Sequence, residues 1–173
     1  MSIVCIKPLE IEFTAGIEID CSMKLNYDSN NPNTNFGISV NADNLYLSIK
    51  QEEEVLKDPI ILDKDCAKDG KLKIDKVMLN KLYLNGVIDF VIDASLTKNS
   101  DNVDSQYGLA WRDTKQQICI EDDTLLAYPN SINDKYKVKV TVKNVHLHEV
   151  DHINNDLDIF YFAGSFLIEP VLI

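Results

Sequence analysis

Apolar and polar or small residues alternate without a break from Leu9 to Asn26. The apolar set occupies the odd-numbered positions, namely Leu9, Ile11, Phe13, Ala15, Ile17, Ile19, Cys21, Met23 and Leu25. A period of two predicts a β-strand with one buried face and one face in water. Because such a strand would be longer than usual, we expect a bend or bulge at Gly16 to divide it in two.

Shorter strand signals continue along the chain, with neither a long amphipathic helix nor a repeat among them. We expect strands at residues 38–42, 45–49, 117–121, 124–128, 135–150 and 157–173. Residues 51–57 are predicted to form a single helical turn that ends at Pro59. Polar loops are expected at residues 28–35 and 98–106, and turns at residues 69–70 and 129–130.

Asn85-Gly86 predicts a β-hairpin, because this dipeptide supplies the positive φ angles of a type I′ turn. A two-residue turn would pair Leu84 with Val87 and Tyr83 with Ile88. One face would then carry the core residues Val77, Leu79, Tyr83, Ile88, Phe90, Ile92 and Ala94. Together these patterns predict an all-β fold: a two-sheet antiparallel sandwich, jelly-roll-like, with residues 1–173 in a single domain.

The chain is strongly acidic, with a formal net charge of −11 at pH 7. This charge repels nucleic-acid phosphates and anionic lipid headgroups, so we expect no nucleic-acid and no membrane partner. The densest basic run is expected on the solvent face of one strand and comprises Lys135, Lys137, Lys139 and Lys143. The opening "MSIVCIKPLEIEF" has no basic start and no continuous apolar core, which indicates a cytoplasmic protein.

The cysteines lie far apart and lack CxxC spacing. We therefore expect small buried side chains in a reducing compartment rather than metal ligands. The residues concerned are Cys5, Cys21, Cys66 and Cys119.

All three histidines lie in "HLHEVDH", at His146, His148 and His152. Apolar residues of the preceding strand are even-numbered, but after Asn144 they become odd-numbered. This change predicts a β-bulge at Asn144, which would point His146 and His148 to solvent. A solvated patch that titrates near pH 6.5 is the main interpretation. A metal site at the three histidines, and with it a metal-dependent enzyme, is the alternative.

Trp111 is the only tryptophan, and Arg112 and Asp113 follow it. An exposed indole ring can stack on a sugar while neighbouring polar groups bond the hydroxyls. These three residues are therefore a candidate glycan site. A core position for the tryptophan is the alternative.

The last segment, "DIFYFAGSFLIEPVLI", is apolar at both odd and even positions. It predicts either a central strand covered on both sides or a surface that meets another subunit. The candidates for self-association are Phe160, Phe162, Phe166 and Ile168.

Two stretches resemble the PixA/AidA family of bacterial inclusion-body proteins. Residues 17–55, "IEIDCSMKLNYDSNNPNTNFGISVNADNLYLSIKQEEEV", are similar to the family's opening strand, its polar stretch rich in Asn and Pro, and its second strand ending near a Gln. "YFAGSFLIEPVLI" is similar to its closing pattern, with Glu169-Pro170 at the acid-proline position, and Trp111-Arg112 resembles a pair in its middle. Ile168 stands where the family has tryptophan. A shorter stretch, "NPN" at residues 31–33, is similar to the WHy domain of LEA type 2 proteins.

The inclusion-body resemblance implies a β-sandwich stored as cytoplasmic inclusions, which can be crystalline, without catalysis. We accordingly expect a non-enzymatic, self-associating homo-oligomer that needs no cofactor. The alternative is a lectin-like module released on lysis, with Trp111 in contact with the glycan. Because the chain is acidic, assemblies are expected to dissolve as the pH rises well above neutral.

Overall fold

The computed structural model describes residues 5–20, 23–25, 36–63, 71–98, 110–154 and 156–173. The loop predicted at residues 28–35, the turn at 69–70 and nearly all of the loop at 98–106 lie outside these residues. The regular elements of the described residues are all strands: β1 (Cys5–Ile6), β2 (Leu9–Asp20), β3 (Met23–Leu25), β4 (Phe36–Asn41), β5 (Leu45–Asp63), β6 (Lys71–Lys98), β7 (Ala110–Tyr128), β8 (Tyr136–Asn154) and β9 (Leu157–Leu172). No helix long and apolar enough to cross a membrane was found among them.

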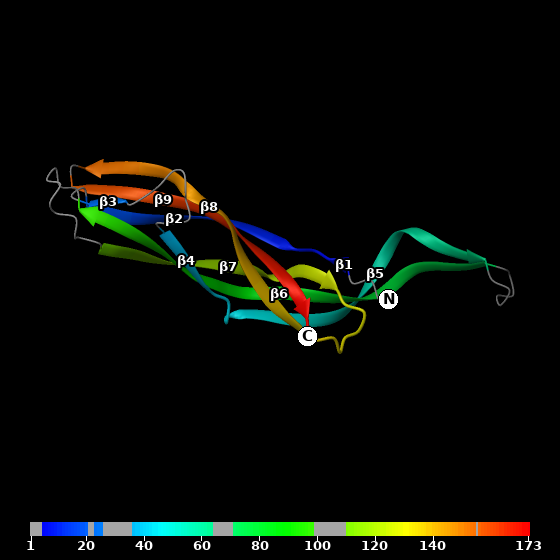
Figure 1. Ribbon diagram of the computed structural model, residues 1–173. Coiled ribbons are helices and arrows are strands. Elements are labelled where there is room, and N and C mark those ends of the chain that lie inside the picture. The colour runs from blue at the N-terminus through cyan, green and yellow to red at the C-terminus, as the bar shows by residue number, and fades with distance from the viewer. Residues whose placement is uncertain (1–4, 21–22, 26–35, 64–70, 99–109, 155) are drawn as a thin grey trace.

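The strands form two antiparallel sheets (Figure 1). In the first sheet β6 has β7 and then β1 on one side, while β3, β4 and β5 follow one another along its other side. The second sheet has the order β2-β9-β8. Period-two alternation gives each sheet one apolar face, and these faces pack together. The predicted two-sheet sandwich is confirmed.

Aromatic rings from both sheets meet in the middle of the core. Phe13 of β2 stacks on Phe166 of β9, with ring centroids 4.6 Å apart. Phe90 of β6 approaches both rings, at 5.0 Å and 5.1 Å. Offset and edge-to-face contacts of this kind add about 1 kcal/mol each beyond the burial of area. The cluster therefore fixes how the two sheets lie against each other.

The bend predicted at Gly16 is absent, because β2 pairs with β9 in one register from Leu9 to Asp20. Gly16 serves packing instead: an added Cβ would lie 3.0 Å from Ile159 and 3.1 Å from Tyr161. The long alternating segment is divided later, where the chain changes sheets between β2 and β3. One alternation therefore spans two strands of different sheets.

The hairpin predicted at Asn85-Gly86 is wrong, because β6 runs through this dipeptide without turning. Buried residues keep even numbers on both sides of it, from Leu82 and Leu84 to Ile88 and onward. Gly86 has a φ of 126° and lies against the loop between β4 and β5, where the Val87 N–H donates to the Asn44 carbonyl. The inner face thus carries the even-numbered residues, so that Ile88, Phe90, Ile92 and Ala94 were predicted correctly and Val77, Leu79 and Tyr83 were not.

The helical turn predicted for residues 51–57 is also wrong, since these residues continue β5. Pro59 falls in the irregularity where the register between β5 and β6 shifts. Beyond the body of the sandwich, β5 and β6 form a two-stranded extension, residues 51–63 with 71–80, called the arm below. Figure 1 shows the arm projecting past the other strands. Among the described residues, its two strands pair only with each other.

Cys119 is exposed, which contradicts the prediction of a buried side chain. The reason is its parity on β7, where the next residue, Ile120, faces the core instead. The side chains of the other three cysteines lie outside the described part of the structure.

Candidate functional site

The bulge predicted at Asn144 is present in β8. Asn144 has a φ of 54°, and the register between β8 and β9 shifts just before His146. As a result Val145 and Leu147 pack against the core, whereas His146 and His148 are exposed. Asn tolerates a positive φ because its short polar side chain can bond locally. The outward position of these two histidines is confirmed.

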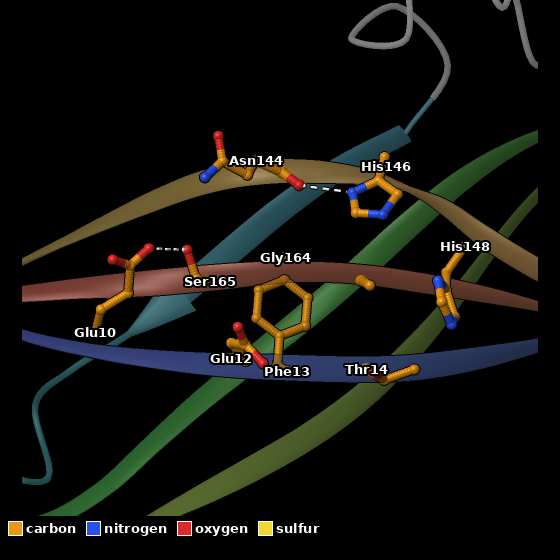
Figure 2. A pocket seen from close by; sticks show the side chains of 10 residues that line it. Glu10, Glu12, Phe13, Thr14, Asn144, His146, His148, Gly164 and Ser165 are labelled. Carbon is orange, nitrogen blue, oxygen red and sulfur yellow. Dashed lines mark hydrogen bonds between the residues drawn. The ribbon is translucent and has the colours of Figure 1, made fainter.

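His146 and His148 stand on one side of an open groove on the outer face of the second sheet, called the histidine groove below (Figure 2). The groove has a volume of about 370 Å³. Side chains of β2 stand on its other side, and β9 provides the floor. The lining residues are Glu10, Glu12, Phe13 and Thr14 of β2, Asn144, His146 and His148 of β8, and Ala163, Gly164 and Ser165 of β9.

The groove exists because the central strand carries small residues where its neighbours carry larger ones. Thr14 of β2 and His146 of β8 both pair with Ala163 of β9. On the core side of β9, Gly164 makes room for the ring of Phe13, whose Cζ would lie 2.9 Å from an added Cβ. The result is a small, partly apolar floor between two polar walls.

Two hydrogen bonds hold polar groups of the groove in place. Ser165 is buried, and its Oγ donates a 2.7 Å bond to Glu10 Oε1. His146 Nδ1 lies 2.8 Å from the Asn144 carbonyl oxygen, so in the neutral ring Nδ1 carries the proton and Nε2 is an acceptor. The groove therefore offers both hydrogen-bond donors and hydrogen-bond acceptors.

The structure does not gather the three histidines into one set of metal ligands. The ring centroids of His146 and His148 are 6.2 Å apart, whereas His152 Nδ1 pairs with Asp158 Oδ1 at 2.7 Å. Among the described residues, no group of three or more His, Cys, Asp or Glu side chains could hold a metal ion. The geometry gives no support to metal-dependent chemistry here.

The predicted glycan residues lie in the other sheet. Trp111, Arg112 and Asp113 belong to β7, where Trp111 is opposite Ser95 and Asp113 is opposite Asp93 of β6. Their side chains lie outside the part of the chain that the structure describes. A glycan contact at Trp111 stays a prediction, and it would be separate from the histidine groove on the second sheet.

The self-association surface predicted on the last strand is wrong for three of its four residues. Phe162, Phe166 and Ile168 are fully buried in the chain's own core, and Phe160 packs against that core. The reason is that β9 is the central strand of the second sheet, so its even-numbered side chains face the first sheet. The opposite face of β9 contributes Ala163 and Ser165 to the histidine groove instead.

Several exposed apolar residues that sequence reasoning missed lie on the arm or at the end of the sandwich next to it. The second sheet ends over Ile49 and Leu82, so the inner face of the first sheet continues uncovered beyond this point. Val55, Ile60 and Met78 of the arm are exposed, as are Ile132, Leu172 and Ile173 at the end of the sandwich. Alternation could not reveal this, because these residues have the same pattern as core residues.

Comparison with known proteins yields no assignment. No protein-family model, curated protein or solved structure matches the chain. The resemblance to inclusion-body proteins therefore stays a prediction.

Proposed function

We propose that the protein is a non-enzymatic, self-associating β-sandwich that accumulates in the cytoplasm as inclusions. The observation that carries this proposal is the arm, whose Val55 and Met78 side chains are 66% and 56% exposed. An isolated two-stranded ribbon is marginally stable in water, because neither of its faces is covered. A second protein layer on the arm would bury these residues and stabilise the ribbon.

Ion pairs between the two strands also support an ordered arm. Cross-strand ion pairs join Lys76 to Glu53 at 2.7 Å and Lys81 to Glu52 at 3.2 Å. The exposed Lys76–Glu53 pair contributes little stability by itself, but cross-strand pairs help to hold the two strands in register. The arm therefore presents its apolar residues in a defined geometry.

Sedimentation velocity on the full chain over a range of concentrations tests the proposal. We expect concentration-dependent oligomers, and we expect Val55→Thr with Met78→Thr to weaken association at least about tenfold, or about 1.4 kcal/mol. Threonine retains a high β-propensity, so the ribbon itself should persist. The matched control is Ile153→Thr. Ile153 is an exposed apolar residue near the end of β8, at the other end of that strand from Tyr136. A monomeric wild-type chain would rule out self-association.

Inclusion formation requires its own test, since a soluble oligomer is not an inclusion. Thin-section electron microscopy and diffraction on cells that express the untagged chain would show dense bodies or ordered lattices. A dispersed protein at high expression would contradict the inclusion part of the proposal.

Glycan binding is a second candidate, favoured by the polar walls and small floor of the histidine groove. A sugar could place one face on Ala163 and Gly164 while Thr14, Glu12 and His148 bond its hydroxyls. A glycan array would identify ligands, and Ala163→Leu should abolish binding by filling the groove. Retention of binding in Ala163→Leu, or an array with no positive glycan, would remove this candidate.

A further inference from the structure

The end of the sandwich beside the arm has an open pocket of about 420 Å³ with both apolar and polar lining residues, called the open-end pocket below. Leu47, Ile49 and Leu82 of the first sheet form one side. Tyr136 of β8 lines the pocket, together with Ile132, Asp134 and Lys135 of the preceding loop and Ile173 at the chain end. Burial raises the pKa of Tyr136, and among the described residues its hydroxyl has no hydrogen-bond partner.

The open-end pocket and the arm form one continuous surface. Ile49 pairs with Leu82 inside the pocket, and the same face continues along the arm through Glu53 opposite Met78. Val55 follows on that face, because side chains two residues apart on a strand point the same way. The chain thus has, side by side, a partly apolar open pocket and a projecting element with exposed apolar side chains.

We propose that a second copy of this chain covers this surface, with Val55 and Met78 of each copy seated in the open-end pocket of the other. This inference rests on the proposed self-association and names its contact. A two-fold arrangement repeats the contact twice, which helps to reach the roughly 1,600 Å² of a stable interface. Each open-end pocket is then filled by side chains of the kind that line it.

Charge explains why a second copy fits here even though each chain carries a net charge of −11. Three glutamates of the arm are paired with Lys76 or Lys81 of the same chain, whereas Asp58 of β5 is exposed. Exposed lysines begin at the open-end pocket with Lys135 and continue along β8 with Lys137 and Lys139. Seating the arm of one copy at the pocket of the other brings Asp58 toward the basic strip, which favours one orientation of the contact.

Charge-reversal rescue on the full chain tests this contact. Met78→Lys and Ile132→Glu should each weaken association at least tenfold in sedimentation velocity, because each places a charge in an apolar contact. The two changes in one chain should restore association to within about threefold of wild type, since the introduced charges meet across the interface. Both positions are exposed, so the variants should fold, which circular dichroism and thermal unfolding would verify.

The control combines Met78→Lys with Ile153→Glu, a pair that should show no rescue. Weakening by Met78→Lys alone, with Ile132→Glu without effect, would overturn the open-end contact while leaving self-association through the arm intact. Weakening by both single changes without rescue would also overturn it. A wild-type chain that is monomeric at every concentration would overturn this inference and the proposed function together.

Discussion

Gly86 is a residue where the first sheet tolerates no side chain. Its φ of 126° is rare for L-residues, and an added Cβ would lie 2.0 Å from the Asn44 carbonyl oxygen. We therefore expect Gly86→Ala to lower the free energy of unfolding by about 2 kcal/mol or more. Urea denaturation measures this, with Gly37→Ala as the control, because a Cβ there meets only Asp93 Oδ2 at 3.8 Å. Equal stability of the two variants would contradict the assigned role.

Asn144 provides a second test of backbone geometry at the residue scale. Its φ of 54° is accessible to asparagine and glycine but costs alanine about 1 kcal/mol. Asn144→Ala should therefore destabilise the fold by about that amount, whereas Asn144→Gly should be close to neutral. Denaturant titration of the two variants separates backbone strain from loss of the side chain. If both lose stability equally, the side chain matters and not the φ angle.

These two residues show what local sequence can and cannot predict. The bulge at Asn144 was predictable, because the parity of the apolar residues changes across it. The dipeptide at Asn85-Gly86 has the composition of a hairpin turn, yet the parity does not change across it. Gly86 is required by the carbonyl of Asn44, a contact that depends on folding and has no local signal.

The base of the arm carries a cluster of polar side chains on the outer face of the first sheet. The Tyr83 hydroxyl donates to Glu52 Oε2 at 2.9 Å, and Lys81 lies 3.2 Å from the same oxygen. The bond from Tyr83, together with Lys81, lowers the pKa of Glu52. Burial and the bond to Glu52 raise the pKa of Tyr83.

The two shifts predict opposite limbs of the pH dependence of stability. The contribution of Glu52 is present above its ordinary pKa near 4.3 and is lost as the pH falls through the lowered value. The contribution of Tyr83 is present below pH 10 and is lost as the pH rises through its raised pKa. Tyr83→Phe should therefore flatten both limbs of the curve of unfolding temperature against pH. An unchanged curve would show that the cluster does not stabilise the fold, and Tyr136→Phe serves as a control for the alkaline limb alone.

Element boundaries were harder to predict than element type. The alternation of β2 and the mixed pattern of β9 correctly indicated strands, because period-two burial is a local property. The sequence predicted breaks in β5 at Pro59 and in β6 at Asn85-Gly86. Both strands continue through these residues, because they are hydrogen-bonded to each other along most of their length. Only part of the histidine groove was predictable from the sequence. The outward position of His146 and His148 was predicted, but the floor at Ala163 was not, because it depends on which strands are neighbours in the sheet.

At the scale of the whole molecule, the two sheets differ in length, and this difference creates the uncovered arm. Sheet length and strand order arise from long-range pairing, so sequence patterns predicted the sandwich but not its open end. The consequence is an acidic molecule with an apolar contact surface at one end. Its association should therefore balance long-range repulsion against local burial.

This balance predicts how association responds to pH and salt. Each copy carries a net charge of −11 at pH 7, and this charge diminishes toward the isoelectric point near 4.6. We expect the dissociation constant to rise from pH 5.5 to pH 7 and again above about pH 9.5, where lysines and tyrosines lose protons. Raising the salt concentration at pH 7 from about 0.05 to 0.5 M should strengthen association, because salt screens the net repulsion and leaves apolar contacts intact. Sedimentation velocity measures both trends. Association that weakens with salt would show that ion pairs between the copies, not burial of Val55 and Met78, hold them together.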